Sequence, residues 1–482
     1  MKLRELLAGV PICAGSADLE MEISGVSYDS RTTRPGDLFV AMTGFATDGH
    51  QYIAKALANG AAAVLCQRRP AEACAYVQTE DSRRALAVIG GNWFGHPAEE
   101  MTMIAVTGTC GKTTTTYLLK AILEQARGVK VGLIGTNQNM IGSDVIPTER
   151  TTPESFEVQK LFREMADAGC THVVMETSSH ALYLDRVYGV RYDVGIFTNL
   201  TQDHLDFHKT MENYCDAKAI LFRNCVTGVV NADDPWTPRL LKDADCKVMT
   251  YAEQADADLR AENIVLSAGG IAFDAVSGAE RVPIRVNIPG GFMVYNTLDV
   301  LGAALALGIS LEESAVVLAK VPHVKGRVEI VPTPGKDYTI LIDYAHTPDS
   351  MVNVLQTVKE FAKGRTVAVF GCGGDRDRTK RPLMGKAAAD WSDFAVVTTD
   401  NPRTEEPEAI IADILPGFDG SATPYHVVVD RIEAIHWAMD HAETDDVIVL
   451  CGKGHETYQE VNHVKHHMDE REIVADYLSS GR

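Results

Sequence analysis

Several features that would place this chain in a special class are missing from its 482 residues. No run approaches about 18 consecutive apolar residues, so no segment is predicted to span a membrane. The ten cysteines include no CxxC pair, which argues against a zinc site or a disulfide framework and favours reduced thiols. No fixed-period repeat and no low-complexity tract occurs. These absences point to an ordinary globular protein.

Positive charge is also scarce. Lys and Arg number 45 against 66 Asp and Glu, so the net charge is −21. A surface this acidic is unsuited to coating nucleic acid or an anionic membrane. Small anionic ligands are not excluded, because screening over about 8–10 Å lets a few local cations dominate a cleft. The apolar stretch near the N-terminus is short and soon broken by charge, which predicts no secretory signal. We therefore expect a cytoplasmic monomer with small-molecule partners, no nucleic acid and no membrane.

The composition and periodicity predict an α/β fold. Hydrophobic residues make up 45% and charged residues 23%, as in globular domains, and the length suggests about three of them. Short apolar strands alternate with helical segments along most of the chain, which predicts parallel βαβ units. Linker-like segments at 91–101 and 324–332 place the domains at 1–97, 98–326 and 327–482.

A phosphate-binding loop is the clearest motif. The strand MTMIAV, residues 101–106, runs into TGTCGKTT, residues 107–114, and then into a helix. Glycines let backbone amides close around phosphate oxygens, a lysine meets the β/γ charge, and a hydroxyl suits Mg²⁺. Val106 stands where the common Walker pattern has its first glycine, so the loop is a shortened variant. The predicted ATP-binding residues here are Gly108, Thr109, Cys110, Gly111, Lys112, Thr113 and Thr114.

Two segments further along carry possible magnesium ligands. Glu176 lies at the carboxyl end of a buried strand, where ligands of open α/β sheets collect. His204 and His208 follow the next strand in TQDHLDFH. From the residues alone, both histidines are equally open to an ordinary hydrogen-bonding role.

Lys218 lies on a predicted helix between Tyr214 and Phe222 and beside Leu221. That apolar stripe predicts burial, and burial favours the neutral amine of lysine. A neutral amine can add carbon dioxide and become a carbamate, which would act as a metal ligand. The alternative is a lysine whose stem covers apolar surface while its ammonium reaches water.

Eight motifs occur together in the order found in the Mur ligases, and the resemblance covers nearly the whole chain. The motifs are TGTCGKTT, METSSHAL, TNLTQDHLDFH, YCDAKAILF, DYAHTPDSM, GCGGDRDRTKRPLMG, DNPRTE and CGKGHE. The resemblance implies three α/β domains: an N-terminal one that holds the UDP end of the substrate, a central one that binds ATP and metal, and a C-terminal, Rossmann-like one that brings the amino acid.

The resemblance also implies site residues. It implies Lys112, Lys218, His204 and His346 as catalytic, and it leaves His346 open to a structural role. It implies Mg²⁺ on Thr114, Glu176, His204 and a carbamylated Lys218, with a lesser claim for His208. It implies adenine and ribose contacts from Asn296, Arg327 and Asp343. It implies contacts to the UDP-muramoyl dipeptide from Ser30, Phe45, Ala46, Thr47, Thr151, Thr152, Ser178 and Arg186.

The chain departs from the family at two positions. Cys110 stands where asparagine is usual, and Leu184 stands where some members have a substrate-contacting glutamine. The second departure puts only that one contact in doubt. The first could alter how the loop meets phosphate, although backbone amides do most of that work.

The resemblance is closest to the Mur ligases that add the third amino acid of the peptidoglycan stem peptide. It implies that ATP activates the D-Glu carboxylate of UDP-N-acetylmuramoyl-L-Ala-D-Glu as an acyl phosphate, and that meso-diaminopimelate then attacks. The form Asp400-Asn401-Pro402-Arg403 is associated with diaminopimelate, whose extra carboxylate a guanidinium can bind through two hydrogen bonds. Arg376, Gly452 and Glu456 are expected to complete the pocket, with Glu456 facing an ammonium.

Other interpretations stay open at this point. The same ligase could add L-lysine or another diamine, or the chain could resemble folylpolyglutamate synthase, which shares the P-loop and metal motifs. A P-loop switch or motor would leave the C-terminal motifs unexplained. A non-catalytic paralogue is conceivable because of Cys110, but the retention of Lys112, Glu176, His204 and Lys218 argues against it. The histidine-rich segment 463–467 lies among charged residues, and we expect a solvated loop there rather than a metal site.

Overall fold

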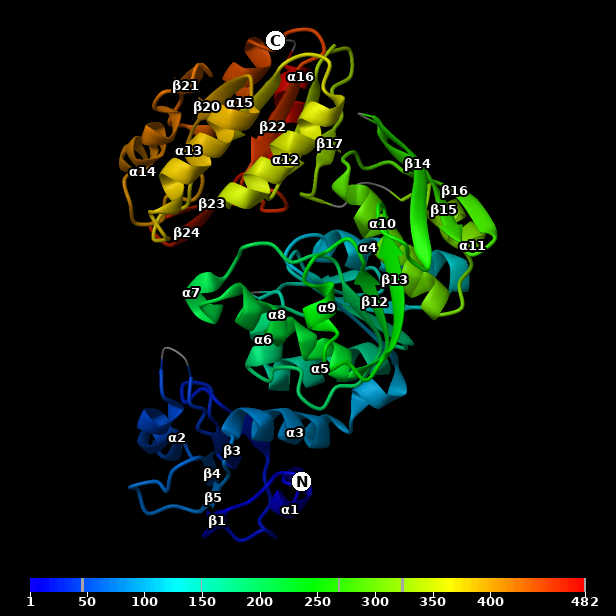
Figure 1. The fold of residues 1–482 in the computed structure, drawn as a ribbon. Coiled ribbons are helices and arrows are strands. Elements are labelled where there is room, and N and C mark those ends of the chain that lie inside the picture. Colours follow the sequence, from blue (N-terminus) through cyan, green and yellow to red (C-terminus); the bar gives the residue numbers. More distant parts are fainter. Residues whose placement is uncertain (45–46, 149, 268, 322–324, 481–482) are drawn as a thin grey trace. The chain divides into compact units, whose positions relative to one another are not determined.

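The computed structural model describes residues 1–44, 47–148, 150–267, 269–321 and 325–480 (Figure 1). The predicted site residues Phe45 and Ala46 lie outside the described residues. The chain divides into two compact units. The first comprises Met1–Val230 and Asp234–Met249, and the second comprises Asn231–Asp233 and Thr250–Arg482.

The first unit begins with a five-stranded sheet in the order β1-β5-β4-β3-β2. Only β1 is antiparallel to its neighbour. The strands are β1 (Ala14–Gly15), β2 (Gly25–Ser27), β3 (Asp37–Val40), β4 (Ala63–Cys66) and β5 (Tyr76–Gln78). The helices of this part are α1 (Leu3–Leu6), α2 (Ile53–Ala58) and α3 (Ser82–Phe94). Residues 91–94 of the predicted linker thus belong to α3.

A second sheet of this unit holds the phosphate-binding loop. Its strands follow the order β12-β11-β6-β10-β7-β8-β9, and those from β12 to β7 are parallel. The strands are β6 (Thr102–Thr107), β7 (Val131–Ile134), β8 (Asn139–Ile141), β9 (Asp144–Ile146), β10 (His172–Glu176), β11 (Tyr192–Phe197) and β12 (Cys225–Asn231). The helices are α4 (Lys112–Arg127), α5 (Ser155–Asp167), α6 (Ser179–Tyr183), α7 (Leu205–His208), α8 (Met211–Ala219) and α9 (Thr237–Leu240).

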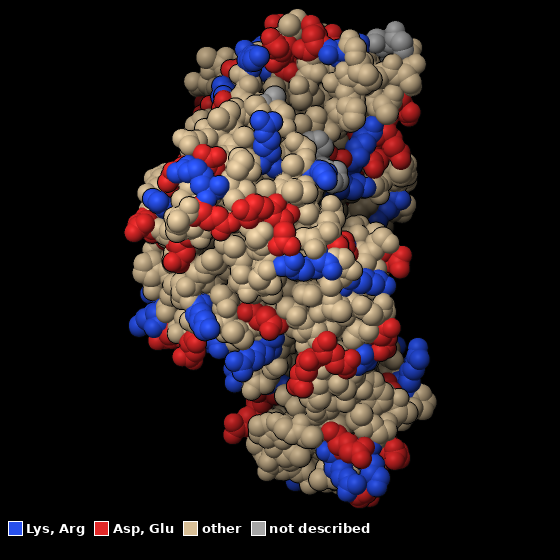
Figure 2. Space-filling view, turned by 90° about the vertical axis from the view of Figure 1, so that its right-hand side faces the viewer, with Lys and Arg blue, Asp and Glu red and all other residues tan. Residues whose placement is uncertain are grey.

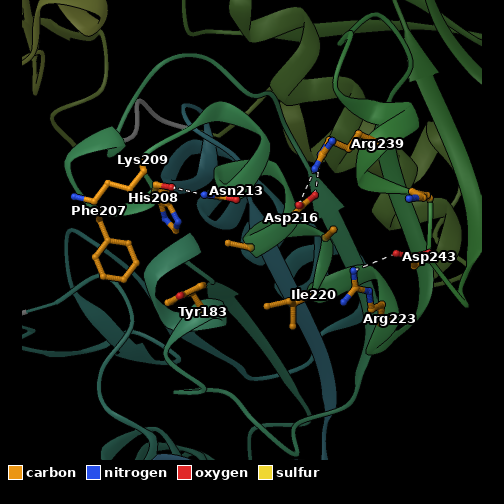
Figure 3. A pocket seen from close by; sticks show the side chains of 13 residues that line it. Tyr183, Phe207, His208, Lys209, Asn213, Asp216, Ile220, Arg223, Arg239 and Asp243 are labelled. Carbon is orange, nitrogen blue, oxygen red and sulfur yellow. Dashed lines mark hydrogen bonds and ion pairs between the residues drawn. The ribbon is translucent and has the colours of Figure 1, made fainter. Parts of the chain in front are cut away.

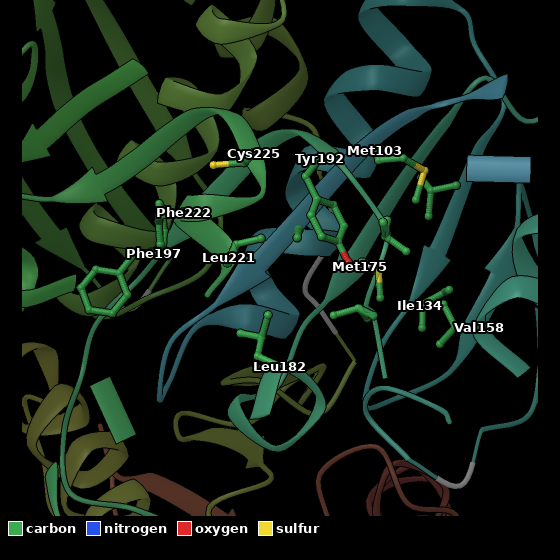
Figure 4. Close-up of a cluster of buried hydrophobic side chains, with 14 of the residues drawn as sticks. Met103, Ile134, Val158, Met175, Leu182, Tyr192, Phe197, Leu221, Phe222 and Cys225 are labelled. Carbon is green, nitrogen blue, oxygen red and sulfur yellow. Dashed lines mark hydrogen bonds between the residues drawn. The ribbon is translucent and has the colours of Figure 1, made fainter. Parts of the chain in front are cut away.

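Buried apolar side chains hold these helices against the sheet (Figure 4). Met103 and Tyr192 come from strands and Phe222 follows α8, and each is at most 1% exposed. Lys218 was expected to share a helix with Phe222, but α8 ends at Ala219 and a short 3₁₀ turn (Leu221–Arg223) follows. Both Leu221 and Phe222 remain fully buried, so the predicted apolar surroundings of Lys218 are present.

The second unit begins with strands that pair first in parallel and then antiparallel, and with two helices. Strand β13 (Lys247–Ala252) crosses the division between the units, and its Tyr251 pairs with Leu259 of β14. The further elements are β14 (Leu259–Ser267), β15 (Gly270–Ser277), β16 (Glu280–Val286), α10 (Phe292–Ala306) and α11 (Leu311–Leu318).

The C-terminal part of the second unit is a six-stranded sheet in the order β17-β18-β22-β19-β20-β21, parallel except for β17. The strands are β17 (Glu329–Val331), β18 (Thr339–Asp343), β19 (Thr366–Phe370), β20 (Phe394–Val397), β21 (Tyr425–Val427) and β22 (Val447–Cys451). The helices are α12 (Pro348–Phe361), α13 (Lys380–Trp391), α14 (Pro407–Ile414), α15 (Arg431–Asp440) and α16 (Glu470–Ser479).

Alternation along these strands builds two cores. Leu341 and Phe370 face the cluster with α12, α13 and α14, whereas Ile340 and Val369 face the cluster with α15 and α16. Successive strand residues point to opposite faces, so an apolar strand buried on both sides reads as a continuous hydrophobic run. The predicted α/β class is therefore confirmed. The residue boundaries proposed for three domains remain a prediction.

Two further expectations meet the structure here. Residues 464–467 form strand β24 (Val464–His467), which pairs with β23 (Tyr458–Val461) in an exposed hairpin, so the solvated loop expected there was wrong in its backbone form. Among the described residues, no helix combines the length and apolar character needed to cross a membrane. On the face drawn in Figure 2, the coloured basic side chains are interspersed with acidic ones.

Candidate active site

The phosphate-binding loop joins β6 to the N-terminus of α4, as the sequence predicts. Gly108 and Gly111 have φ values of 148° and 90°, which suit glycine. A β-carbon at Gly108 would overlap Thr198 Oγ1. The first turn of α4 directs backbone N–H groups and the positive end of the helix dipole toward the loop. This geometry is suited to holding phosphate groups.

Residues after β11 hold the loop through its backbone. Asn199 accepts hydrogen bonds from the backbone N–H groups of Thr109 at 2.8 Å and Cys110 at 3.0 Å. Thr198 Oγ1 donates to the Cys110 carbonyl at 2.6 Å. Because these contacts use main-chain atoms of Cys110, its side-chain departure from the family leaves them intact. Thr198 and Asn199 belong to the quoted motif TNLTQDHLDFH, yet their role was not predicted.

Two lysines meet at the same carbonyl of this loop. Lys112 Nζ donates to Gly108 O at 2.9 Å and to Thr109 O at 2.7 Å. Lys218 Nζ donates to Gly108 O at 2.7 Å and lies 4.4 Å from the ring centroid of Tyr214. Lys218 is 1% exposed. Burial first, and the nearby charge of Lys112 second, hold the pKa of Lys218 well below its ordinary value. The structure thus confirms the predicted burial of Lys218 and the predicted shift toward its neutral amine.

Glu176 lies at the same sheet edge as the loop. In the parallel register Glu176 pairs with Val106, and Phe197 pairs with Thr107, so three strand ends lie side by side. Glu176 is fully buried, and its carboxylate accepts hydrogen bonds from Thr136 N at 2.9 Å and Thr136 Oγ1 at 2.8 Å. Thr136 was not predicted, because no sequence motif ties it to Glu176.

The two histidines differ in their surroundings. His204 has φ 53°, its side chain is 47% exposed, and its Nε2 lies 3.3 Å from Asp203 Oδ2. His208 is buried, and its Nε2 shares a 2.9 Å hydrogen bond with Ser179 Oγ. The rings of both lie close to His180, with centroids 4.8 and 5.3 Å apart. His208 thus has a hydrogen-bonding role, while His204 is the more open of the two.

The donor set around the loop suits magnesium bound together with phosphates. Among the residues that the structure describes, no group of three or more His, Cys, Asp or Glu could by itself hold a metal. Mg²⁺ commonly takes only one or two carboxylates and completes its shell with phosphate oxygens and water. The Thr114 hydroxyl and the Glu176 carboxylate are hard oxygen donors at this edge, so the residues present fit that ion.

A third group of predicted residues adjoins Glu176. Thr152 Oγ1 donates to the Glu176 carbonyl at 2.9 Å and accepts from Ser178 N at 3.2 Å. Arg186 Nη1 donates to the Thr152 carbonyl at 3.1 Å, and its Nε lies 3.5 Å from a Glu154 carboxylate oxygen. The structure therefore brings together Thr152, Ser178 and Arg186.

Other residues predicted to face the UDP-muramoyl substrate are placed elsewhere in the first unit or beside this group. Thr151 Oγ1 lies 3.0 Å from Thr136 Oγ1. Ser30 is buried and Thr47 accepts from Gly44 N at 2.9 Å, both in the part with the five-stranded sheet. The Ser178 hydroxyl also caps helix α6 by accepting from Ala181 N at 3.1 Å.

A cavity of about 500 Å³ lies beside α8 (Figure 3). Asp216, Ala217 and Ala219 of that helix line it, but Lys218 does not. Arg239 in its wall is bound to Asp216 by two hydrogen bonds of 2.8 Å. The cavity is therefore on a different side of α8 from the lysine that meets the loop.

Three residues predicted to hold adenine and ribose belong to the second unit. Asn296 is buried on α10, and Asp343 ends β18 with its carboxylate accepting from Val328 N at 2.8 Å. Burial raises the pKa of Asp343, and the charge of Arg327 opposes that rise. The Arg327 guanidinium lies 5.3 Å from the ring centroid of Tyr344.

His346 follows in the same segment. Its Nδ1 lies 2.8 Å from the Tyr344 carbonyl, which can only accept, so Nδ1 carries the proton. In the neutral ring Nε2 is then a hydrogen-bond acceptor. The ring also contacts that of Tyr344, with centroids 4.5 Å apart.

A buried lysine organises the predicted amino-acid pocket. Lys453 is fully buried, and its Nζ donates to Asn401 Oδ1 at 2.8 Å and to Glu456 Oε2 at 2.7 Å. Asn401 Nδ2 donates to the same Glu456 oxygen at 3.0 Å. Glu456, predicted to meet an ammonium, thus already binds one from the protein. Lys453 lies within CGKGHE but was not singled out from the sequence.

Further pocket residues follow the same strand ends. Asp400 Oδ2 is buried without a hydrogen-bond partner among the described residues, and a β-carbon at Gly452 would lie 2.5 Å from it. Arg376 is exposed. The Arg403 side chain is 18% exposed, and its Nη1 donates to Gly374 O at 2.7 Å. The next segment is anchored by fully buried Arg381, which pairs with Glu405 at 2.7 Å. The structure therefore gathers the DNPR and CGKGHE segments.

Three family models match the chain. Residues 22–92 match "Mur ligase family, catalytic domain", residues 106–304 match "Mur ligase middle domain", and residues 326–454 match "Mur ligase, glutamate ligase domain". The models together cover more than half of the chain, including the phosphate-binding loop and the DNPR segment.

Named relatives agree over nearly the full length. The UDP-N-acetylmuramoyl-L-alanyl-D-glutamate--2,6-diaminopimelate ligase of Clostridium botulinum is 48% identical over 95% of both chains. Ligase 1 of that name from Clostridium acetobutylicum is 47% identical over 99% of both. A solved structure titled as such a ligase has a TM-score of 0.72 and 32% identity, and covers 100% of this chain and 99% of its own.

The folylpolyglutamate synthase of Mycobacterium tuberculosis is also similar in structure. Its TM-score is 0.62 at 19% identity, with 77% of this chain and 92% of that chain covered. At that identity the likeness concerns the fold alone.

Proposed function

Since this chain belongs to the Mur ligase family, we propose that it is a ligase of the MurE type, which joins 2,6-diaminopimelate to UDP-N-acetylmuramoyl-L-alanyl-D-glutamate at the expense of ATP. The observation that carries this function is the 48% and 47% identity, over nearly whole chains, to ligases of that name. A P-loop switch would need neither the DNPR nor the CGKGHE segment. Their shared contacts in one pocket favour a ligase that receives an amino acid.

The reaction follows from the chemistry of carboxylates. A carboxylate oxygen is a poor leaving group, so the D-glutamyl γ-carboxylate first attacks the γ-phosphorus of ATP, which gives an acyl phosphate and releases ADP. The amine of diaminopimelate then attacks the acyl carbon, loses a proton, and inorganic phosphate leaves. Two anions meet in the first step, so positive charge at the phosphates supplies much of the catalysis.

Lys112 and the N-terminus of α4 are suited to that task. The Lys112 ammonium lies on the carbonyls of Gly108 and Thr109, at the mouth of the loop. It can exchange these neutral acceptors for phosphate oxygens, and charge-assisted hydrogen bonds are the stronger ones. We assign Gly108, Gly111, Thr113 and the rest of the loop to the phosphates, and Asn296, Arg327 and Asp343 to the nucleoside.

The bound metal in this proposal is Mg²⁺. Thr114 and Glu176 would hold it, with His204 as the exposed third group. Such an ion supplies charge neutralisation and polarises the phosphoryl oxygens. Thr136 would then act on Glu176, because its two hydrogen bonds fix the orientation of the carboxylate.

We assign to Lys218, on α8, the carbamylation that would supply a further metal ligand. Its neutral amine would add carbon dioxide to form a carbamate and release one proton. The supporting observations are full burial, a lowered pKa, and the ammonium of Lys112 on the same carbonyl. A carbamate there would place a negative charge beside the Lys112 ammonium, and the two groups would attract each other.

Selection of diaminopimelate is assigned to Arg403, with Arg376, Asp400, Asn401, Pro402, Gly452 and Glu456 around it. Diaminopimelate differs from lysine by one carboxylate, and leaving such a charge buried and unpaired costs about 2–5 kcal/mol. Selection by the size of one methylene supplies only about 1–3 kcal/mol. The guanidinium therefore decides between the two diamines. His346, with Nε2 as an acceptor, is suited to orient a substrate N–H or O–H group.

The substrate dipeptide is assigned to Thr151, Thr152, Ser178 and Arg186, and the uridine nucleotide to Ser30 and Thr47. We further place the enzyme in the cytoplasm as a monomer acting on small molecules. No disulfide joins the cysteines of the described residues, which supports a reducing compartment.

Phosphate release tests this function. The purified protein is supplied with ATP, Mg²⁺ and UDP-N-acetylmuramoyl-L-Ala-D-Glu, and then with meso-diaminopimelate, L-lysine or no diamine. We expect release that depends on the dipeptide and is fastest with meso-diaminopimelate, together with a longer peptide product. Equal ATP cleavage without dipeptide and diamine, and no new peptide, would refute the proposal. A preference for lysine would retain the ligase and refute only the choice of diamine.

A further inference from the structure

The backbone of Arg403 is anchored on strand β23. Arg403 has φ 54°, in the left-handed region that non-glycine residues rarely adopt. Its N–H donates to the Glu460 carbonyl at 3.0 Å, and its carbonyl accepts from Asn462 N at 2.8 Å. Strained residues of this kind persist only where their surroundings hold them. The hairpin of β23 and β24 therefore fixes the backbone position from which the Arg403 side chain extends.

Two of the three nitrogen atoms of the Arg403 guanidinium have hydrogen-bond partners in the protein. Nη1 donates to the Gly374 carbonyl at 2.7 Å, and Nε donates to Glu460 Oε2 at 3.2 Å. A β-carbon at Gly373 would lie 2.9 Å from Nη1, so the glycine permits this close approach. A guanidinium has five N–H donors. Among the described residues, no partner is present for Nη2, which leaves that end for a ligand.

Glu460 links the guanidinium to the rest of the pocket. Its backbone N–H donates to Asn401 Oδ1 at 2.8 Å, the same oxygen that accepts from Lys453. Its side chain is 20% exposed. One residue thus contacts Asn401 through the main chain and Arg403 through both main chain and carboxylate.

We propose that Glu460 is a positioning residue that determines selection of the diamine. This inference rests on the proposed function. The carboxylate of Glu460 fixes the plane of the Arg403 guanidinium, so that Nη2 and the second Nη1 hydrogen face the extra carboxylate of diaminopimelate. Holding a long side chain in its binding conformation before the ligand arrives lowers the entropic cost of binding. Lysine lacks that carboxylate and gains nothing from this arrangement.

If Glu460 acted only through its charge, removing that charge would change the affinity for diaminopimelate in the opposite direction. A carboxylate near the binding site repels the carboxylate of diaminopimelate, so its removal would then improve binding. Length and charge can be separated with three variants. Glu460→Ala removes both, Glu460→Asp keeps the charge but is too short to keep the Nε contact in place, and Glu460→Gln keeps the length and an acceptor oxygen.

The experiment measures KM and kcat of the full chain for meso-diaminopimelate, L-lysine and ATP. For Glu460→Ala and Glu460→Asp we expect KM for diaminopimelate to rise about tenfold with kcat within about twofold, because the loss concerns preorganisation of binding. KM for ATP should stay unchanged, and the preference for diaminopimelate over lysine should fall about tenfold. Glu460→Gln should stay within about threefold of the unaltered protein.

Glu472→Gln is the matched control. Glu472 makes an exposed 2.6 Å ion pair with His467 of the same hairpin. Its loss should leave all three KM values unchanged.

Three outcomes decide the inference. It is overturned if Glu460→Ala leaves the preference for diaminopimelate unchanged, or if Glu460→Gln lowers KM for diaminopimelate. If the alanine variant does not fold, the contrast between the aspartate and glutamine variants decides, and equal KM values for those two overturn it. An unaltered protein that gives no diaminopimelate-dependent phosphate release refutes the proposed function instead.

Discussion

Replacing Lys218 by methionine should stabilise the protein and abolish its ligase activity. The Lys218 ammonium is fully buried and shares the Gly108 carbonyl with Lys112. Burial disfavours a charged amine, and exchanging even a buried ion pair for apolar side chains of similar volume is often stabilising by about 1–4 kcal/mol. Loss of the hydrogen bond to Gly108 O and of the contact with the Tyr214 ring reduces this gain by about 1–2 kcal/mol. Gly108 O keeps Lys112 as a donor, so no buried acceptor is left unpaired.

The net gain is about 1 kcal/mol, which for a unit of this size raises the unfolding temperature by about 2–4 °C. The gain should depend on pH. The pKa of Lys218 is lowered in the folded protein, so the unfolded chain binds more protons, and the stability of the unaltered protein rises with pH toward the ordinary lysine pKa. The advantage of Lys218→Met is therefore largest in acid and shrinks as pH rises toward the ordinary lysine pKa.

Thermal unfolding in buffer free of carbon dioxide and Mg²⁺ measures this effect, and phosphate release measures the activity. Lys120→Met is a matched control, because Lys120 is also buried but pairs with Glu124 at 2.6 Å. That variant should be destabilised. Bicarbonate should raise the unfolding temperature of the unaltered protein and leave Lys218→Met unchanged. A Lys218→Met protein that unfolds below the unaltered one in acid would refute the desolvation argument.

Three further changes have expected outcomes. Arg403→Ala should raise KM for diaminopimelate by about 30-fold or more, from the about 2–5 kcal/mol of an unpaired buried carboxylate, and leave KM for ATP unchanged; equal damage to both, in phosphate-release assays, would contradict the assignment. Glu176→Gln keeps an acceptor for Thr136 but loses charge, so the Mg²⁺ concentration for half-maximal activity should rise about tenfold; a magnesium titration that matches the unaltered protein would argue against a metal there. Hydrogen bonds from Arg381 first, and from Asp375 N second, lower the pKa of Glu405 to about 2. That stabilisation is present above the ordinary glutamate pKa and is lost as pH falls toward 2. Arg381→Met should therefore lower the free energy of unfolding by about 2–3 kcal/mol at neutral pH, which is less than for a wholly buried pair because Glu405 is partly exposed. The difference between the two proteins should become smaller in acid. Urea unfolding at both pH values checks this, and an equal loss at each would show that the ion pair is not the cause.

Much of the fold and part of the site could be predicted because the information is local. The eight residues from Thr107 to Thr114 are contiguous, so one strand and one helix place them wherever the sheet lies. Glu176 could be predicted because parallel strands end at one edge. The buried surroundings of Lys218 followed from neighbouring apolar residues, although the helix itself ends at Ala219.

The supporting residues could not be predicted in the same way. Asn199 lies 89 residues from Cys110, and Thr136 lies 40 residues from Glu176. Hydrogen bonds over such separations depend on strand order and register, which no local pattern encodes. The strand in the histidine-rich segment could not be predicted because all of its residues are exposed, so no alternation of apolar and polar residues marks it.

The amino-acid sequence by itself determined the α/β class and the phosphate-binding loop, because each depends on adjacent residues or on strict periodicity, and the role proposed for Arg403 came from the resemblance of the DNPR segment to the Mur ligases. Only the tertiary structure decided that Lys112 and Lys218 share one carbonyl, that Lys453 joins Asn401 to Glu456, and that Glu460 holds Arg403. These contacts set the charge and orientation of each group, and they exist only where folding brings distant strand ends together.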